Sequence, residues 1–365
     1  MARTFIGLGD AKAVKRYSVA MVHETSQKSF TGRNLTAKDG SLPIHRIVDL
    51  ERQAGDTVSL DIWHRLTARG NEGEVDLVGT EERLSSDTMT LSIDQLEHGV
   101  NCGGRMSQKR IMAPLREIGM KKLSEWWARM DDELFFVYAA GHRGDESGDW
   151  LLPTSFTTRA GNAVTANTAG RTIIHRDASG AESGIDADAK MDVETLEEIS
   201  YQLKSMAHPP KPIMVNGEEK FIVIMSPVAE KQLRLGTSAG GWAEIRKYRT
   251  DEAPYWKEAL GGWNNLILYS HPKIPKRNQG AGGVAVAHNI ILGAQAVAKA
   301  HGDSNGNGQI FDWHEEMDNR GTVPIINTFS IFGMKRVDLK LSETDSAASE
   351  FGVISLLTYG GTAVS

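Results

Sequence analysis

Residues 114–141 constrain the fold more than any other part of the sequence, because they predict one helix that is long enough to span a domain. Apolar side chains recur along the segment at spacings of three to five residues, at Leu115, Ile118, Leu123, Trp126, Met130, Leu134 and Val137. Pro114 suits the first turn of a helix, and Gly141 suits its end. At a rise of about 1.5 Å per residue, roughly 27 residues extend about 40 Å. A helix of this length spans a whole domain.

Two runs of alternating apolar and polar residues, 57–62 and 88–93, predict a pair of half-buried strands ahead of the helix. Between them lies a stretch rich in glycine and charge, residues 65–87, which predicts a long projecting loop at the tip of a hairpin. An isolated two-stranded hairpin is marginally stable in water, so a long one needs a surface to lie on. Another copy of the chain could provide that surface.

The second half of the chain mixes helices and strands. Residues 191–206 predict an amphipathic helix that ends before Pro209 and Pro210, and residues 227–235 and 292–299 predict two short helices. Strands are predicted at residues 171–174, 221–225, 265–269, 283–291, 323–332, 335–341 and 351–358. Strands that return late in the chain join elements laid down early, which indicates an α+β fold.

Charge and cysteine content exclude several classes of function. The 41 basic and 47 acidic side chains give a net charge of −6, and no basic tract stands out, which argues against sequence-specific DNA binding. The single cysteine, Cys102, excludes an intrachain disulfide and a cysteine-rich zinc cluster, and it is typical of a protein made in a reducing cytoplasm. Neither a signal peptide nor a membrane span is expected, because no apolar run is long enough.

The acidic segment from Asp303 to Asp318 is the main candidate for a metal-binding or catalytic site. Its first six residues, DSNGNG, match the opening of a calcium-binding loop, but His314 stands where the closing glutamate is needed and Glu315 falls one residue late. The residues that follow also lack the second histidine of a zinc hydrolase motif. We therefore expect a surface turn and a solvated acidic segment, and we predict no catalytic, cofactor or metal site. A metal-dependent hydrolase that uses this segment is the alternative hypothesis.

Two further regions leave alternatives open. Adjacent helical side chains point about 100° apart, so Trp126 and Trp127 are both buried only if the helix is covered on two sides. Packing between domains or packing between subunits would each do this. Residues 1–50 lack a strong period, which is compatible either with an extended arm that takes its order from neighbouring molecules or with a frayed terminus.

The order of these parts resembles the Hong Kong ninety-seven-type capsid proteins of tailed bacteriophages, and more specifically the group of the major capsid protein of a short-tailed coliphage. The resemblance runs from about residue 45 to the C-terminus. Its motifs are GDTV at 55–58, IDQLEHGV at 93–100, GGRMSQ at 103–108, SEWW at 124–127, LGAQA at 292–296, WHEE at 313–316, IFGMK at 331–335 and FGVI at 351–354. The order of the motifs carries the likeness more than any single one.

The resemblance implies a fold with an N-arm (1–50), an E-loop hairpin (51–105), a spine helix with part of the P-domain (106–190), mainly the A-domain (191–320), and returning strands of the A- and P-domains (321–365). It implies a structural protein and not an enzyme, one that assembles into hexamers and pentamers of an icosahedral shell around double-stranded DNA. The protein is then expected in the virion, and in the host cytoplasm during assembly.

The resemblance also implies partners. The first 50 residues are too short for a fused scaffolding domain, so a separate scaffolding protein is expected, together with a portal and a decoration or cement protein. Contact with the packaged DNA should be weak and nonspecific, given the net charge. Residues at the hairpin tip and on the helix are the candidates for subunit interfaces: Arg65, Arg69, Glu81, Glu82, Arg83, Trp126 and Trp127. A cytoplasmic ring or tube protein outside any virion remains a third hypothesis.

Overall fold

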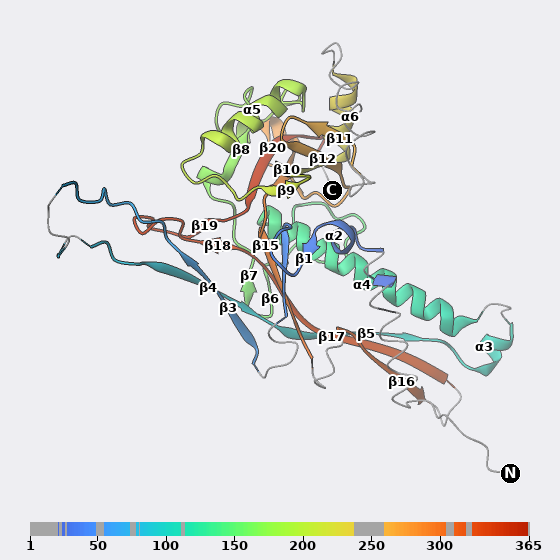
Figure 1. Ribbon diagram of the computed structural model, residues 1–365. Helices are drawn as coiled ribbons and strands as arrows, with labels where there is room; N and C mark the ends of the chain where they lie inside the picture. The colour runs from blue at the N-terminus through green and yellow to red at the C-terminus, as the bar shows by residue number, and fades with distance from the viewer. Residues whose placement is uncertain are drawn as a thin grey trace.

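The computed structural model describes residues 21, 24–25, 28–48, 55–73, 78–79, 81–110, 114–236, 259–303, 310–318 and 323–363. A long helix crosses the centre of the molecule, with a rounded lobe on one side of it and an elongated sheet on the other (Figure 1). A thin hairpin projects from the end of this sheet. Most of the predicted N-terminal arm before residue 28 lies outside the described residues, as do residues 304–309 of the calcium-like loop.

The long helix is α4 (Leu115–Ala140), which confirms the helix predicted from the sequence. It begins after Pro114 and ends at Gly141, whose φ of 76° is a left-handed conformation that suits glycine. The Gly141 N–H donates to the carbonyl of Val137 at 3.0 Å and closes the last turn. Residues 133–140 are buried on every side, whereas Ile118 near the start of the helix is exposed. The C-terminal half of α4 is therefore enclosed in the protein core.

The rounded lobe is a three-layer structure. Its mixed sheet has the order β11-β12-β10-β14-β20-β8. The strands are β8 (Thr172–Ile174), β10 (Glu218–Met225), β11 (Gly261–Trp263), β12 (Leu266–Ser270), β14 (Ala285–Leu292) and β20 (Val353–Gly361). Alternate residues of β10 face opposite sides: Ile222 and Ile224 join the cluster around α4, while Val223 and Met225 join the cluster beneath α5 (Val193–Ser205) and α6 (Pro227–Leu235). Burial on both faces explains why residues 221–225 of this strand are all apolar.

The elongated sheet is organised around β17 (Val323–Arg336) and has the order β1-β2-β15-β17-β16, with β5 also paired to β17. Its other strands are β1 (Thr36–Ala37), β2 (Ile44–Ile47), β5 (Asp94–Asn101), β15 (Val297–Gly302) and β16 (Asp312–Asp318). Residues 325–332 of β17 pair with β5 along one edge of the strand. The opposite edge of β17 pairs with β16 and β15. On that edge β15 and β16 lie in tandem.

The projecting hairpin consists of β3 (Thr57–Trp63) and β4 (Ser86–Ser92), paired antiparallel from Thr57↔Ser92 to Trp63↔Ser86, as the sequence predicted. Smaller elements complete the fold: α2 (Phe30–Asn34), α3 (Arg105–Arg110), β6 (Thr158–Arg159), β7 (Asn162–Ala163), β9 (Ile213–Val215), β13 (Lys276–Arg277), β18 (Asp338–Leu339) and β19 (Ser349–Glu350). In the described part of the chain, no helix has the length and apolar character needed to cross a membrane.

One local prediction was wrong, and another missed a strand. Residues 292–299 do not form a short helix: they hold the end of β14, a turn in which Gln295 has a φ of 57°, and the start of β15. The small apolar residues there resemble a helical segment, but pairing of β15 with both β2 and β17 decides their conformation. The acidic residues 312–318 form strand β16, which the sequence did not predict; Trp313 is buried, while His314, Glu316, Met317 and Asp318 are exposed, as expected of a solvated segment.

At Gly333 the backbone of β17 passes close to the backbone of β4 at the base of the hairpin. A Cβ atom at this position would lie 2.0 Å from the Ser92 carbonyl oxygen. We expect Gly333→Ala to lower the free energy of unfolding by about 2 kcal/mol, since the two backbones must move apart. Chemical denaturation of the unassembled protein measures the loss. Gly148→Ala, which meets no atom within 4 Å, is the control, and equal losses in the two variants would contradict the proposed clash.

Candidate functional site

The hairpin tip, defined here as residues 65–84, is the most exposed part of the described chain. It is held together from within: the Glu82 carboxylate accepts hydrogen bonds from the backbone N–H groups of Thr67 (2.6 Å) and Ala68 (2.7 Å) on the opposite side of the loop. These two N–H donors hold the pKa of Glu82 below its ordinary value. Glu82 therefore stabilises the shape of the tip.

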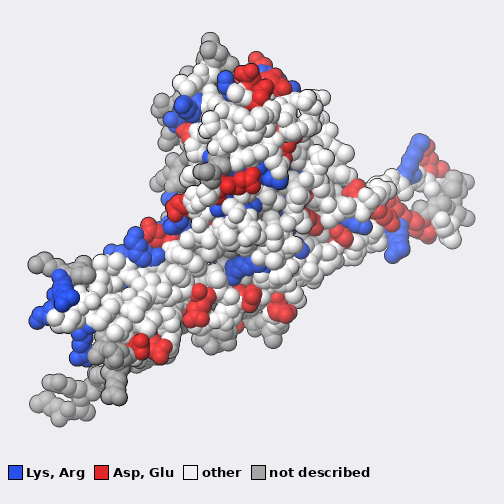
Figure 2. Space-filling model, turned by 180° about the vertical axis from the view of Figure 1, so that it is seen from behind, with Lys and Arg blue, Asp and Glu red and all other residues white. Residues whose placement is uncertain are grey.

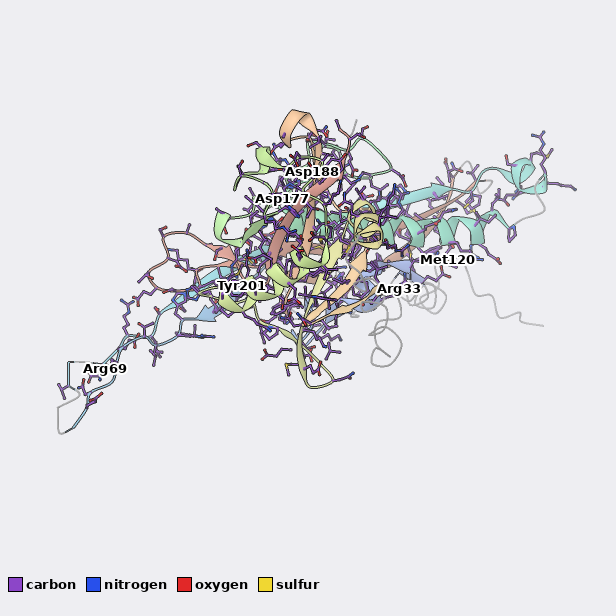
Figure 3. All side chains as sticks on the ribbon, turned by 90° about the horizontal axis from the view of Figure 1, so that it is seen from above. Arg33, Arg69, Met120, Asp177, Asp188 and Tyr201 are labelled. Atoms are coloured by element: carbon purple, nitrogen blue, oxygen red, sulfur yellow. The ribbon has the colours of Figure 1, made fainter. Side chains whose placement is uncertain are left out.

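The strands of the hairpin pack against the body of the protein, and hydrogen bonds attach the hairpin again at its neck, next to the tip. The His64 imidazole bonds to Ser85 Oγ at 3.0 Å and to the Lys340 carbonyl at 2.9 Å, and the Lys340 N–H donates to Asp87 at 2.8 Å. Every hydrogen bond found among the described residues of the tip stays within the tip. The tip thus extends away from its own protomer, with Arg69 near its far end (Figure 3).

The charged tip residues predicted at interfaces are placed differently from one another. Arg69 pairs with Glu72 at 2.7 Å, but both side chains are largely exposed, so the pair contributes little stability. Glu81 accepts a hydrogen bond from the Gly79 N–H at 2.7 Å. Arg65 and Arg83 are exposed and have no ion pair with any described residue. The tip therefore offers charged groups that its own chain leaves largely in solvent.

The two adjacent tryptophans of α4 have different environments. Trp127 is 2% exposed, its Nε1–H donates to Thr328 Oγ1 at 2.8 Å, and its ring packs edge-on against Phe311 and Phe332. Its indole is thus enclosed within the protomer, which favours packing between elements over packing between subunits. Trp126 is partly exposed and stacks on His98, with ring centroids 4.1 Å apart. Of the two, only Trp126 has surface left to contact another chain.

The segment of residues 28–38 is docked on α4 through Asp132. This carboxylate accepts hydrogen bonds from the backbone N–H groups of Phe30 (3.0 Å) and Thr31 (3.0 Å), and from the hydroxyls of Ser29 (2.8 Å) and Thr31 (2.7 Å). It therefore caps the first turn of α2 from another helix. Burial raises the pKa of Asp132, while the N–H and hydroxyl donors around the carboxylate act in the opposite direction.

The described part of the acidic segment, Asp303 and residues 310–318, does not form a metal centre. Glu315 is ion-paired with Arg116 of α4 at 2.6 Å and accepts a hydrogen bond from the Trp313 indole at 3.0 Å. Among the described residues, no three His, Cys, Asp or Glu side chains are grouped so that they could hold a metal ion. Cys102 is buried at the start of the segment that leads to α3, and burial raises the pKa of its thiol, as expected of a structural cysteine.

Comparison with known proteins gives one consistent answer. The sequence profile of the family described as "Phage capsid protein" matches residues 5–361. The capsid of Ralstonia phage GP4 is similar in structure, with a TM-score of 0.82 and 31% identity over 98% of both chains. The capsid of cyanophage Pam1 aligns with a TM-score of 0.69 and 15% identity over 99% of this chain and 97% of that one. The acid-stable capsid of Helicobacter pylori bacteriophage KHP30 aligns with a TM-score of 0.61 and 12% identity over 89% of each chain. No curated protein sequence matches.

The central helix, the two sheets and the projecting hairpin, together with these structural neighbours, define a shell-forming protein of the Hong Kong ninety-seven type. The α+β fold expected from the sequence is confirmed. The chain belongs to the phage capsid protein family. It is a major capsid protein that assembles with copies of itself into the shell of the virion, which confirms the reading of the sequence as a structural protein.

Proposed function

We propose that the hairpin tip builds the shell by lying across a neighbouring copy of the chain. The observation that carries this proposal is the exposure of apolar side chains along the hairpin: Trp63 is 65% exposed, and Leu66, Val78 and Leu84 are exposed to a similar or greater extent. Soluble proteins rarely leave several such groups together on one projecting element unless a partner covers them. Arg65, Arg69, Glu81 and Arg83 would then provide polar contacts at the rim.

In this proposal hexamers and pentamers close an icosahedral shell around double-stranded DNA. One chain must then make several different contacts, which suits a thin hairpin fixed to a body with a rigid central helix. Trp126, with part of its indole exposed beside His98, would add a contact on the side of α4. The proposed role of the chain is shell formation, and we propose no catalytic activity for it. Assembly would take place in the host cytoplasm.

Further partners are proposed on more general grounds. A separate scaffolding protein, a portal and a decoration or cement protein would complete the particle. On the face drawn in Figure 2, the basic side chains lie among acidic ones and broad uncharged areas and do not form one continuous basic surface. With a net charge of −6, contact with packaged DNA would be weak and nonspecific.

Replacement of residues 66–83 by a short glycine-serine turn tests the role of the tip. We expect the yield of closed shells, counted by negative-stain electron microscopy after co-expression with the neighbouring phage genes, to fall at least about tenfold. The melting temperature of the unassembled protein should change by no more than about 2 °C, because the neck bonds of His64 and Asp87 remain. A normal yield of closed shells from the shortened chain would contradict the proposed role of the tip.

A further inference from the structure

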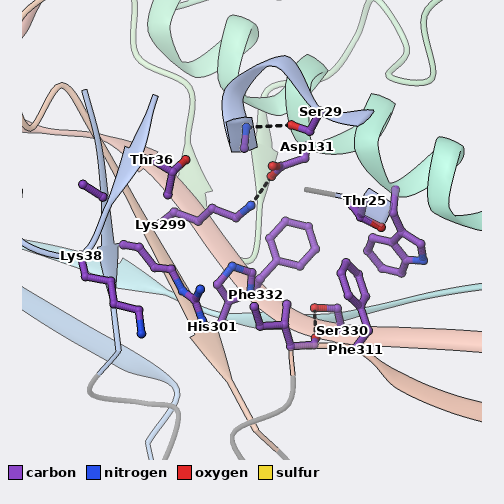
Figure 4. A pocket seen from close by; sticks show the side chains of 15 residues that line it. Thr25, Ser29, Thr36, Lys38, Asp131, Lys299, His301, Phe311, Ser330 and Phe332 are labelled. Atoms are coloured by element: carbon purple, nitrogen blue, oxygen red, sulfur yellow. Dashed lines mark hydrogen bonds and ion pairs between the residues drawn. The ribbon is translucent and has the colours of Figure 1, made fainter. Parts of the chain in front are cut away.

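A cavity of about 290 Å³ lies between the docked segment of residues 28–38 and the body of the protein, with Thr25 also in its wall (Figure 4). Its other walls come from α4, β15 and β17. The volume is far above the roughly 30 Å³ that one water molecule occupies, and it lies at the lower end of the range of small-molecule sites, about 300–1,000 Å³. The cavity has room for a small ligand, and the shell-forming role does not require one.

His301 and Thr25 of the lining each bury a polar atom that has no hydrogen-bond partner among the described residues. His301 on β15 is 5% exposed, and its Nδ1 forms no hydrogen bond; Thr25 is 7% exposed, and the same is true of its Oγ1. A buried donor or acceptor that stays unpaired loses its hydrogen bonds to water and gains none in return, which destabilises the fold. The other hydroxyls on the wall are satisfied, since Ser330 donates to the Ile310 carbonyl and Thr36 donates to the Thr31 carbonyl. The unpaired atoms therefore need a separate explanation, which a ligand would provide.

The charges of the lining indicate the sign of that ligand. Among the described residues, the lining holds the basic side chains of Lys38, Arg46 and Lys299 and one carboxylate, Asp131, which is ion-paired with Lys299. Burial lowers the pKa of His301 well below its ordinary value, and the charges of Lys299 and Arg46 act in the same direction. The imidazole is therefore neutral, and with its proton on Nδ1 it is a hydrogen-bond donor beside an excess of positive charge.

We propose that this cavity is a binding site for a small oxyanion, a carboxylate or a phosphate. His301 Nδ1–H and Thr25 Oγ1–H would donate to its oxygen atoms, while Lys299 and Arg46 would supply the compensating charge. Phe311 and Phe332 form the apolar part of the wall, where hydrogen bonds to a charged ligand are stronger than in water. An oxyanion here would link the docked segment to β15 and stabilise the attachment of both to α4.

Inorganic phosphate is a suitable probe, titrated calorimetrically into the unassembled full-length protein at constant ionic strength. We expect saturable binding, about tenfold weaker in His301→Leu, because this variant loses the hydrogen bond from Nδ1 to the charged ligand. Asp131→Asn should instead bind phosphate about tenfold more tightly, since it removes the one carboxylate of the lining. His45→Leu, on strand β2 next to Arg46 but outside the lining, is the matched control and should bind like the unaltered protein.

His301→Leu should fold at least as well as the unaltered chain, because it removes an unpaired buried polar atom. A second titration, into closed shells, separates two sources of the oxyanion. If only the unassembled protein binds phosphate, a carboxylate of a neighbouring subunit fills the cavity in the shell; if both forms bind it, the ligand is a free anion. Either result supports the site. Absence of saturable binding in both forms, or equal affinities for the His301→Leu and His45→Leu proteins, would overturn it.

Discussion

Replacement of Trp127 by alanine should lower the free energy of unfolding of the unassembled protein by about 4 kcal/mol. The indole is buried among Phe311 and Phe332, and it donates the hydrogen bond to Thr328 that joins α4 to β17. Truncation of a large buried aromatic side chain leaves a cavity that the surrounding residues fill only in part, at a cost of about 3–5 kcal/mol. Urea denaturation followed by far-ultraviolet circular dichroism measures the change.

The neighbouring residue provides the control. Trp126→Ala removes a partly exposed side chain, so we expect a loss of only about 1 kcal/mol in the protomer. If Trp126 lies at a subunit contact, as we propose, the same variant should form fewer shells although its protomer remains folded. Similar losses of stability in the two variants would mean that the enclosed environment of Trp127 is not what stabilises α4 against β17.

Replacement of Asp132 by alanine should lower the free energy of unfolding by about 3 kcal/mol and detach the segment around α2. The carboxylate receives two backbone N–H groups and two hydroxyls from Ser29, Phe30 and Thr31. Hydrogen bonds to a charged acceptor are worth about 1.5–3 kcal/mol each, and part of this is regained when the freed donors meet water. Hydrogen exchange at the amides of Phe30 and Thr31 should become faster in the same variant.

Glu125→Gln is the control for Asp132→Ala, because Glu125 lies on the exposed side of the same helix and pairs only with Lys122 three residues earlier. Its expected loss is at most about 0.5 kcal/mol. If Asp132→Ala cost no more than this control, or if the exchange of the α2 amides were unchanged, the docked segment would be held mainly by other contacts, such as the packing of Phe30 on Phe136.

Local patterns predicted those elements whose burial follows a simple period. The bounds of α4 and the strands of the hairpin follow from apolar spacing and from the capping positions of Pro114 and Gly141. Strand β16 could not be predicted in this way, because only Trp313 among its seven residues is buried and its acidic side chains resemble a surface loop. Pairing with β17, the next strand along the chain, decides its structure, and the apolar spacing within residues 312–318 does not reveal this pairing.

The candidate interface could be predicted only in part, because some of its contacts form across the loop between residues that no sequence pattern connects. A long charged loop between two alternating strands is visible in the sequence, so Arg65, Arg69 and Arg83 could be named. The internal role of Glu82 depends on the approach of Thr67 and Ala68 across the loop, which residue types do not reveal. The cavity around His301 could not be predicted from the sequence, because its walls come from segments between residues 25 and 332 that share no sequence motif.

The arrangement of strands along β17 has a mechanical consequence. Its fourteen residues are flanked by β5 on one edge and by β15 and β16 in tandem on the other, and α4 lies against the same strand through Trp127. Antiparallel hydrogen bonds lie perpendicular to the strands, so a force along β17 loads many of them in shear at once and does not open them one by one. When pressure inside a filled particle stretches its wall, we expect β17 to resist extension. Most of the deformation should then occur in the hairpin neck around His64.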